Sequence, residues 1–140
     1  MKPLKSILLI DDDDNFNYLH MRLLTKMNVA HHVEIVTNGQ QALDFLISQN
    51  ELKKEYPDLI FLDIDMPIMD GWSFLLEYEM LIRKVFSKSV LAMFTSNGDE
   101  AIRKKALSID FVNIFFVKPL TTSDINYILD KYFTNSPVIA

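Results

Sequence analysis

The chain has 140 residues, of which 49% are hydrophobic and 24% charged, a composition typical of one globular domain with a single core. Its formal net charge of -5 argues against a basic surface for nucleic acid, so we expect no nucleic-acid partner. The absence of cysteine excludes a disulfide framework and a thiolate metal site, and is compatible with a reducing compartment.

The first apolar run, residues 7–10, passes directly into four aspartates, Asp11 to Asp14. Four apolar residues are far too few for a signal peptide or a membrane span, so we expect a cytoplasmic protein without membrane contact. A segment with helical spacing follows, and its apolar residues at intervals of three and four predict one buried stripe: Phe16, Leu19, Leu23, Leu24 and Met27.

The order of an apolar run followed by a segment with helical spacing occurs twice more. A second apolar run at 32–36 is followed by a turn at 37–39 and by helical spacing at Leu43, Leu46 and Ile47. A third run at 59–64 precedes a helix predicted over 70–86, with a stripe formed by Phe74, Leu75, Tyr78, Leu81 and Ile82.

The last two runs, 90–94 and 113–117, precede a short helical pattern at 101–107 and a clearer one at 125–132. Thr121 and Asp124 stand where a variant of the capping box would start the final helix. Four of the five apolar runs are nearly continuous, as in parallel strands covered on both faces. Five alternations of strand and helix therefore predict an α/β domain with helices on both sides of a parallel sheet.

Polar side chains gather at the predicted strand ends, which share one edge of such a sheet: Asp11 and Asp12, Asp63 and Asp65, Thr95 and Ser96, and Lys118. Two carboxylates about 4 Å apart repel by roughly 4 kcal/mol at an effective dielectric constant of 20. A divalent cation relieves that repulsion, and an incomplete set of oxygen ligands suits Mg²⁺. The alternative without a metal is that some of these acids only cap a helix. Capping accounts for one or two of them, Asp13 or Asp14.

Four motifs together resemble the receiver domain of two-component response regulators: LLIDDD at 8–13, PDLIFLDIDMPIMDGW at 57–72, FTS at 94–96 and FFVKPLT at 115–121. The resemblance covers residues 5–133, and it leaves 134–140 as a short tail. It implies a flavodoxin-like, doubly wound sheet of five parallel strands in the order 2-1-3-4-5, with five helices. Because the matched range leaves no room for an output domain in these 140 residues, we expect a stand-alone receiver.

By this resemblance, Asp63 accepts a phosphoryl group from a phosphohistidine on a sensor histidine kinase or a histidine phosphotransfer protein. A carboxylate is a competent nucleophile for this step. The metal would be Mg²⁺, bound directly by Asp12, through water by Asp11, and by the backbone carbonyl of Asp65, with Asp63 also among the metal residues.

The resemblance also implies roles for the fourth and fifth strand ends. Lys118, in a cis peptide bond with Pro119, would pair with Asp63 and then with the phosphoryl oxygens. Thr95 and the backbone N–H of Ser96 would donate hydrogen bonds to those oxygens. Thr95 and Phe115 would form a switch that changes the face of the fourth helix, fifth strand and fifth helix, where a downstream target could bind. Whether the protein binds such a target or shuttles phosphoryl groups stays open at this point.

The enzymatic alternative is a phosphohydrolase of the haloacid dehalogenase class, with Asp63 as the nucleophile and Asp65 as the acid. Against it, that D-x-D motif normally follows the first strand, and Pro67 stands where Thr or Val is usual. The acidic pair Asp11 and Asp12 would also have no role. We therefore expect a signalling domain and not an enzyme.

Overall fold

The computed structural model describes residues 3–52, 55–83 and 88–134. Five strands and five helices alternate in these ranges: β1 (Leu4–Ile10), α1 (Asp14–Lys26), β2 (Ala30–Val36), α2 (Gly39–Glu51), β3 (Leu59–Asp63), α3 (Gly71–Leu81), β4 (Val90–Thr95), α4 (Glu100–Leu107), β5 (Ile114–Val117) and α5 (Thr122–Tyr132). All but one residue of the predicted tail, and the predicted end of the third helix at 84–86, lie outside the described residues.

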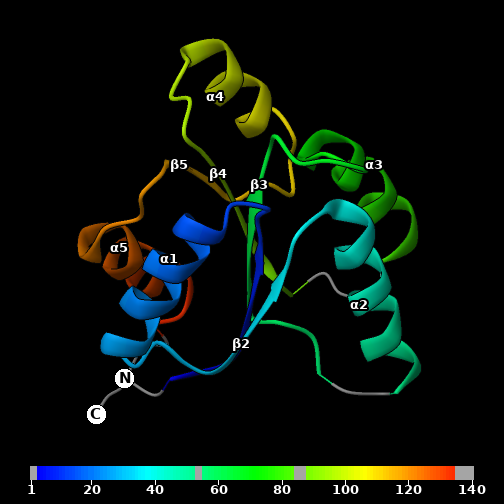
Figure 1. The fold of residues 1–140 in the computed structure, drawn as a ribbon. Helices are drawn as coiled ribbons and strands as arrows, with labels where there is room; N and C mark the ends of the chain where they lie inside the picture. Colours follow the sequence, from blue (N-terminus) through cyan, green and yellow to red (C-terminus); the bar gives the residue numbers. More distant parts are fainter. Residues whose placement is uncertain (1–2, 53–54, 84–87, 135–140) are drawn as a thin grey trace.

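The strands form one parallel sheet in the order β2-β1-β3-β4-β5, which confirms the predicted fold class and strand order. Helices α1 and α5 cover one face of the sheet, and α2, α3 and α4 lie on the other (Figure 1). The order of the strands reverses between β1 and β3, so the carboxyl ends of these two strands flank the switch point where ligands bind in open α/β sheets.

Successive side chains of β1 serve two different cores. Leu8 and Ile10 belong to the core under α2, α3 and α4, whereas Ile7 and Leu9 belong to the core under α1 and α5. All four side chains are 0% exposed. This double burial explains why the strand reads as a continuous apolar run and not as an alternating one.

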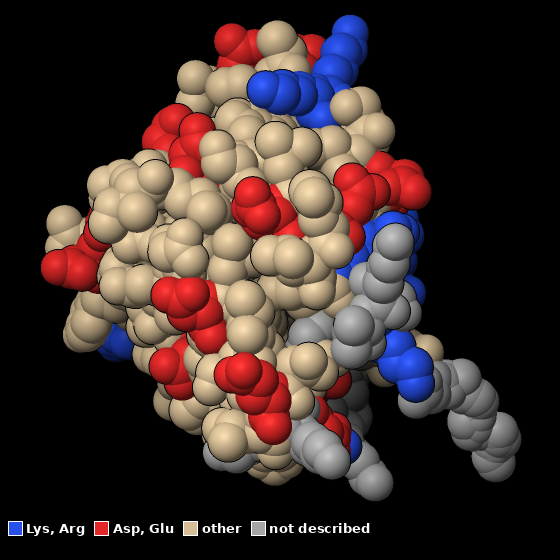
Figure 2. Space-filling model, turned by 90° about the vertical axis from the view of Figure 1, so that its right-hand side faces the viewer, with Lys and Arg blue, Asp and Glu red and all other residues tan. Residues whose placement is uncertain are grey.

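Three positions of the predicted helical stripes are wrong. Leu19 in α1 is 50% exposed, Ile47 in α2 is 38% exposed and Leu81 in α3 is 56% exposed. In α3 the outward surface also carries Leu76 and Met80, so hydrophobic residues surround that helix and periodicity alone does not mark its buried side. Figure 2 shows the side of the molecule formed by α2 and α3, with acidic side chains lying separately among uncharged ones.

The predicted helix starts are mostly confirmed. Asp13 caps α1 by accepting a hydrogen bond from the Phe16 N–H at 3.0 Å, which agrees with the capping interpretation of one aspartate in the acidic run. Thr121 and Asp124 form a reciprocal capping box at the start of α5. Within the described ranges, no helix has the length and apolar character needed to cross a membrane.

Candidate functional site

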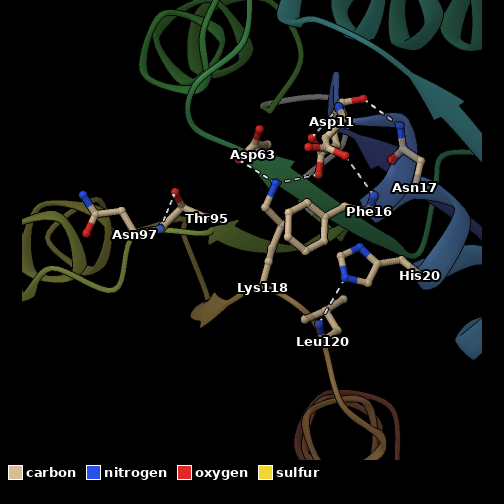
Figure 3. A network of polar contacts seen from close by, with 10 residues as sticks. Asp11, Phe16, Asn17, His20, Asp63, Thr95, Asn97, Lys118 and Leu120 are labelled. Carbon is tan, nitrogen blue, oxygen red and sulfur yellow. Dashed lines mark hydrogen bonds and ion pairs between the residues drawn. The ribbon is translucent and has the colours of Figure 1, made fainter.

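Three charged side chains from distant parts of the chain meet at the carboxyl edge of the sheet (Figure 3). The Lys118 Nζ lies 2.8 Å from Asp11 Oδ2 and 3.3 Å from Asp63 Oδ1. The side chains of Lys118, Asp11 and Asp63 are 4%, 0% and 7% exposed. Sequence reasoning anticipated a Lys118–Asp63 pair, but the shorter contact with Asp11 was not foreseen.

The four consecutive aspartates divide into different tasks because the chain turns sharply after β1. The Asp13 N–H donates to Asp11 Oδ1 at 3.0 Å, and the Asn17 amide donates to the Asp11 backbone carbonyl at 2.9 Å. These bonds direct the Asp11 carboxylate into the pocket, while Asp12 is exposed beside it. Asp14 is exposed in the first turn of α1, where its charge is favourable to the helix dipole.

A cluster of three carboxylates fits a hard cation. Asp11, Asp12 and Asp63 each offer one oxygen, and these oxygens all lie within 4.8 Å of one another. An all-oxygen, anionic donor set that stays partly open to solvent suits Mg²⁺. The side chain of Asp65 is exposed beyond the end of β3 and does not belong to this carboxylate cluster.

Burial and the crowding of negative charge together raise the pKa of Asp63. Burial, followed by the neighbouring Asp11 carboxylate, raises the pKa of Asp63 to about 7, whereas Lys118 acts in the opposite direction. Burial among other carboxylates thus disfavours the ionised form of Asp63. The same crowding of carboxylates would favour the binding of a cation.

The remaining predicted residues lie at the end of β4, in the loop that follows it, and in β5. Thr95, which is 2% exposed at the end of β4, accepts a hydrogen bond from the Asn97 N–H at 3.3 Å. Ser96 is exposed at the start of the following loop. Phe115 is half-buried in β5 beside Met93 and packs on the core under α2, α3 and α4, the sheet face to which Thr95 also points.

Sequence reasoning missed an aromatic cradle for Lys118. The Lys118 Nζ lies 4.4 Å from the centroid of the Phe16 ring and 5.3 Å from that of Phe94. His20 packs against both rings, at centroid distances of 5.8 Å from Phe16 and 5.4 Å from Phe94. The only sequence feature that pointed here was a histidine four residues after Phe16 in an otherwise apolar helical pattern. The Lys118–Pro119 bond is cis.

The sequence of the chain is similar to those of known proteins. Residues 7–130 match the family model described as the response regulator receiver domain. The chain is 32% identical to two-component response regulator 24 of Arabidopsis thaliana, over 89% of this chain and 81% of that protein. It is 30% identical to the chemotaxis protein CheY of Halobacterium salinarum, over 89% of this chain and 97% of that protein.

Solved structures agree with these sequence matches. A two-component response regulator from Cytophaga hutchinsonii superposes with a TM-score of 0.86 at 28% identity, over 93% of this chain and 97% of that chain. These matches do not favour the phosphohydrolase alternative. Its proposed acid, Asp65, also lies outside the carboxylate cluster.

Proposed function

This chain belongs to the response regulator receiver domain family, and on that basis we propose that it accepts a phosphoryl group on Asp63 from a phosphohistidine of a partner protein. The observation that best supports this role is the position of the Asp63 carboxylate, which lies at the switch point of the sheet, beside Lys118 and clustered with the other pocket acids. The donor would be a sensor histidine kinase or a histidine phosphotransfer protein. The protein is a signalling domain and not a conventional enzyme.

In the proposed transfer, one Asp63 carboxylate oxygen attacks phosphorus in line with the bond to the histidine nitrogen. The new O–P bond forms as the N–P bond breaks, and the departing imidazole keeps the bonding electron pair and takes up a proton from water. Asp63 must be ionised to act as the nucleophile, and Lys118 at 3.3 Å favours its ionised form. Transfer of this kind depends mainly on positioning and charge stabilisation.

Asp11, Asp12 and Asp63 would hold a Mg²⁺ ion, which when bound neutralises charge on the carboxylates and the phosphoryl oxygens. The backbone carbonyl of Asp65 stands as a proposed additional ligand. The Lys118 ammonium would donate a hydrogen bond to one phosphoryl oxygen. The Thr95 hydroxyl and the Ser96 N–H, at the end of the adjacent strand β4, would donate to another.

The proposed response starts at Thr95. A phosphoryl group adds up to two negative charges and strong acceptor oxygens, which draw the Thr95 hydroxyl toward Asp63. The half-buried Phe115 ring, on the same face of the sheet, can then fill the space beside β4. A change at this ring would reach α4, β5 and α5 as a shift between two packed states, and a downstream partner would bind there.

Phosphorylation of purified protein tests the assignment of Asp63. Incubation with acetyl phosphate and Mg²⁺ should add one phosphoryl mass to the wild type and none to Asp63→Asn. Asp44→Asn removes the same charge from an exposed position on α2 and should be phosphorylated like the wild type. An undiminished adduct in Asp63→Asn would show that the acceptor is another residue.

A further inference from the structure

We propose that His20 is a positioning residue for Lys118. Its imidazole holds the backbone that follows Lys118, and it also supports the two aromatic rings that the Lys118 ammonium overlies. The effect on phosphoryl transfer rests on the function proposed above. The structural part, that His20 fixes where Lys118 lies, does not depend on it.

The first contact is a hydrogen bond between α1 and the loop that joins β5 to α5. The Leu120 N–H donates to His20 Nε2 at 3.1 Å, across 100 residues of chain. Leu120 is 6% exposed, and Pro119 before it has no N–H to offer. Because a buried N–H without an acceptor is costly, His20 satisfies a group that this loop has to bury.

The second contact is with the aromatic cradle. The His20 ring stacks on Phe16 with an interplanar angle of 19° and packs on Phe94 at a centroid distance of 5.4 Å. The same two rings lie under the Lys118 ammonium, at 4.4 Å and 5.3 Å. Figure 3 shows His20 between the Leu120 backbone and the Phe16 ring, with the Lys118 side chain running alongside. His20 thus touches the loop and both rings that confine the lysine.

A simple space-filling role does not explain a histidine at this position. His20 is 1% exposed, and its Nδ1 has no hydrogen-bond partner within the described part of the chain. Since Nε2 accepts a hydrogen bond, the neutral ring carries its proton on Nδ1, and burial lowers the pKa of His20 to about 4. A leucine would fill the space without burying an unpaired donor. What the imidazole supplies and leucine lacks is the acceptor for the Leu120 N–H.

The position of Lys118 is sensitive to this bond because the lysine is two residues before Leu120. Its ammonium lies 2.8 Å from Asp11 and 3.3 Å from Asp63, distances at which a displacement of about 1 Å breaks a hydrogen bond. Displacements of this size can lower a rate by about a hundredfold when positioning is the main contribution. Loss of the Leu120 anchor should therefore weaken the contacts of Lys118 without removing any group from the pocket.

Two variants separate the acceptor from the bulk of the side chain. His20→Leu keeps an apolar side chain but offers no acceptor, whereas His20→Gln can place its amide oxygen near the position of Nε2. His32→Leu, on the exposed face of edge strand β2, is the matched control for loss of an imidazole. For each protein we would measure hydrogen exchange of the Leu120 amide without phosphodonor, and the rate of Asp63 phosphorylation by acetyl phosphate with Mg²⁺.

In His20→Leu we expect exchange at Leu120 to become about tenfold faster, and phosphorylation about tenfold slower, than in the wild type. His20→Gln should stay within about threefold of the wild type on both measurements, and the control should match the wild type. Should His20→Leu not fold, His20→Met, with an unbranched apolar side chain, serves the same comparison.

Wild-type values in His20→Leu would overturn the proposal. So would equal losses in His20→Leu and His20→Gln, because packing and not the acceptor would then be responsible. If the wild type itself gained no phosphoryl group on Asp63, the function proposed above would fail. The exchange of Leu120 would still decide whether His20 anchors the loop.

Discussion

Replacing Lys118 by methionine removes the positive charge of the pocket and keeps most of the apolar stem. Breaking a buried ion pair by removing one partner typically costs about 3 to 5 kcal/mol, because the other charge is left uncompensated. Here the loss is smaller because Asp63 can bind a proton instead of remaining charged. We expect Lys118→Met to lower the free energy of unfolding by about 2 to 3 kcal/mol at pH 8 without metal, a fall in Tm of roughly 10 °C.

The loss of stability in Lys118→Met should depend on pH, and the direction of that dependence follows from the pKa of Asp63. Lys118 lowers the pKa of Asp63, so its removal raises that pKa further above the ordinary value of a carboxyl group. A carboxyl group whose pKa is raised by folding stabilises the fold below its unfolded pKa, and this contribution is lost as the pH rises through the folded pKa. The difference in the free energy of unfolding between the wild type and Lys118→Met should therefore be smaller at pH 5 than at pH 8, by about 1 kcal/mol or more.

Thermal and urea unfolding at pH 5 and pH 8, each with and without Mg²⁺, would measure these differences. Mg²⁺ should stabilise Lys118→Met more than the wild type, because it supplies the missing counter-charge. Lys104→Met, on the exposed surface of α4, should change stability by less than about 0.5 kcal/mol. A deficit that does not vary with pH, or no deficit at pH 8, would refute the view that Lys118 acts through its charge.

The acidic run and the switch give two further predictions. Asp12→Ala should weaken Mg²⁺ binding about tenfold in a titration, whereas Asp13→Ala should keep the affinity and lose roughly 1 kcal/mol of stability as a helix cap; equal losses of affinity would mean that the metal ligands are misassigned. Beryllofluoride, an acyl-phosphate mimic, should change NMR shifts in the Mg²⁺-bound protein from Asp63 as far as residues 99–133. Changes confined to the neighbours of Asp63 would contradict a switch at Phe115 and favour a phosphoryl shuttle.

Much of the local structure could be predicted because its causes lie within a few residues. The apolar runs mark strands buried on both faces, and the caps at Asp13 and Thr121 depend on neighbours three residues away. The helix α3 was harder, because hydrophobic residues such as Leu76 and Met80 also cover its exposed side. Periodicity cannot identify the buried side of a helix whose outer surface is apolar as well.

The sequence by itself determined which chemical groups stand at the strand ends, and with them the fold class and the acidic character of the pocket. The resemblance implied the pairing of Lys118 with Asp63, but only the tertiary structure decided the other contacts of the site. The contact between Lys118 and Asp11 joins residues 107 positions apart, and the bond from Leu120 to His20 joins residues 100 positions apart. Such pairings depend on strand order, on the turn after each strand and on the direction of each side chain, and these are set by packing of the whole domain and not by any local pattern.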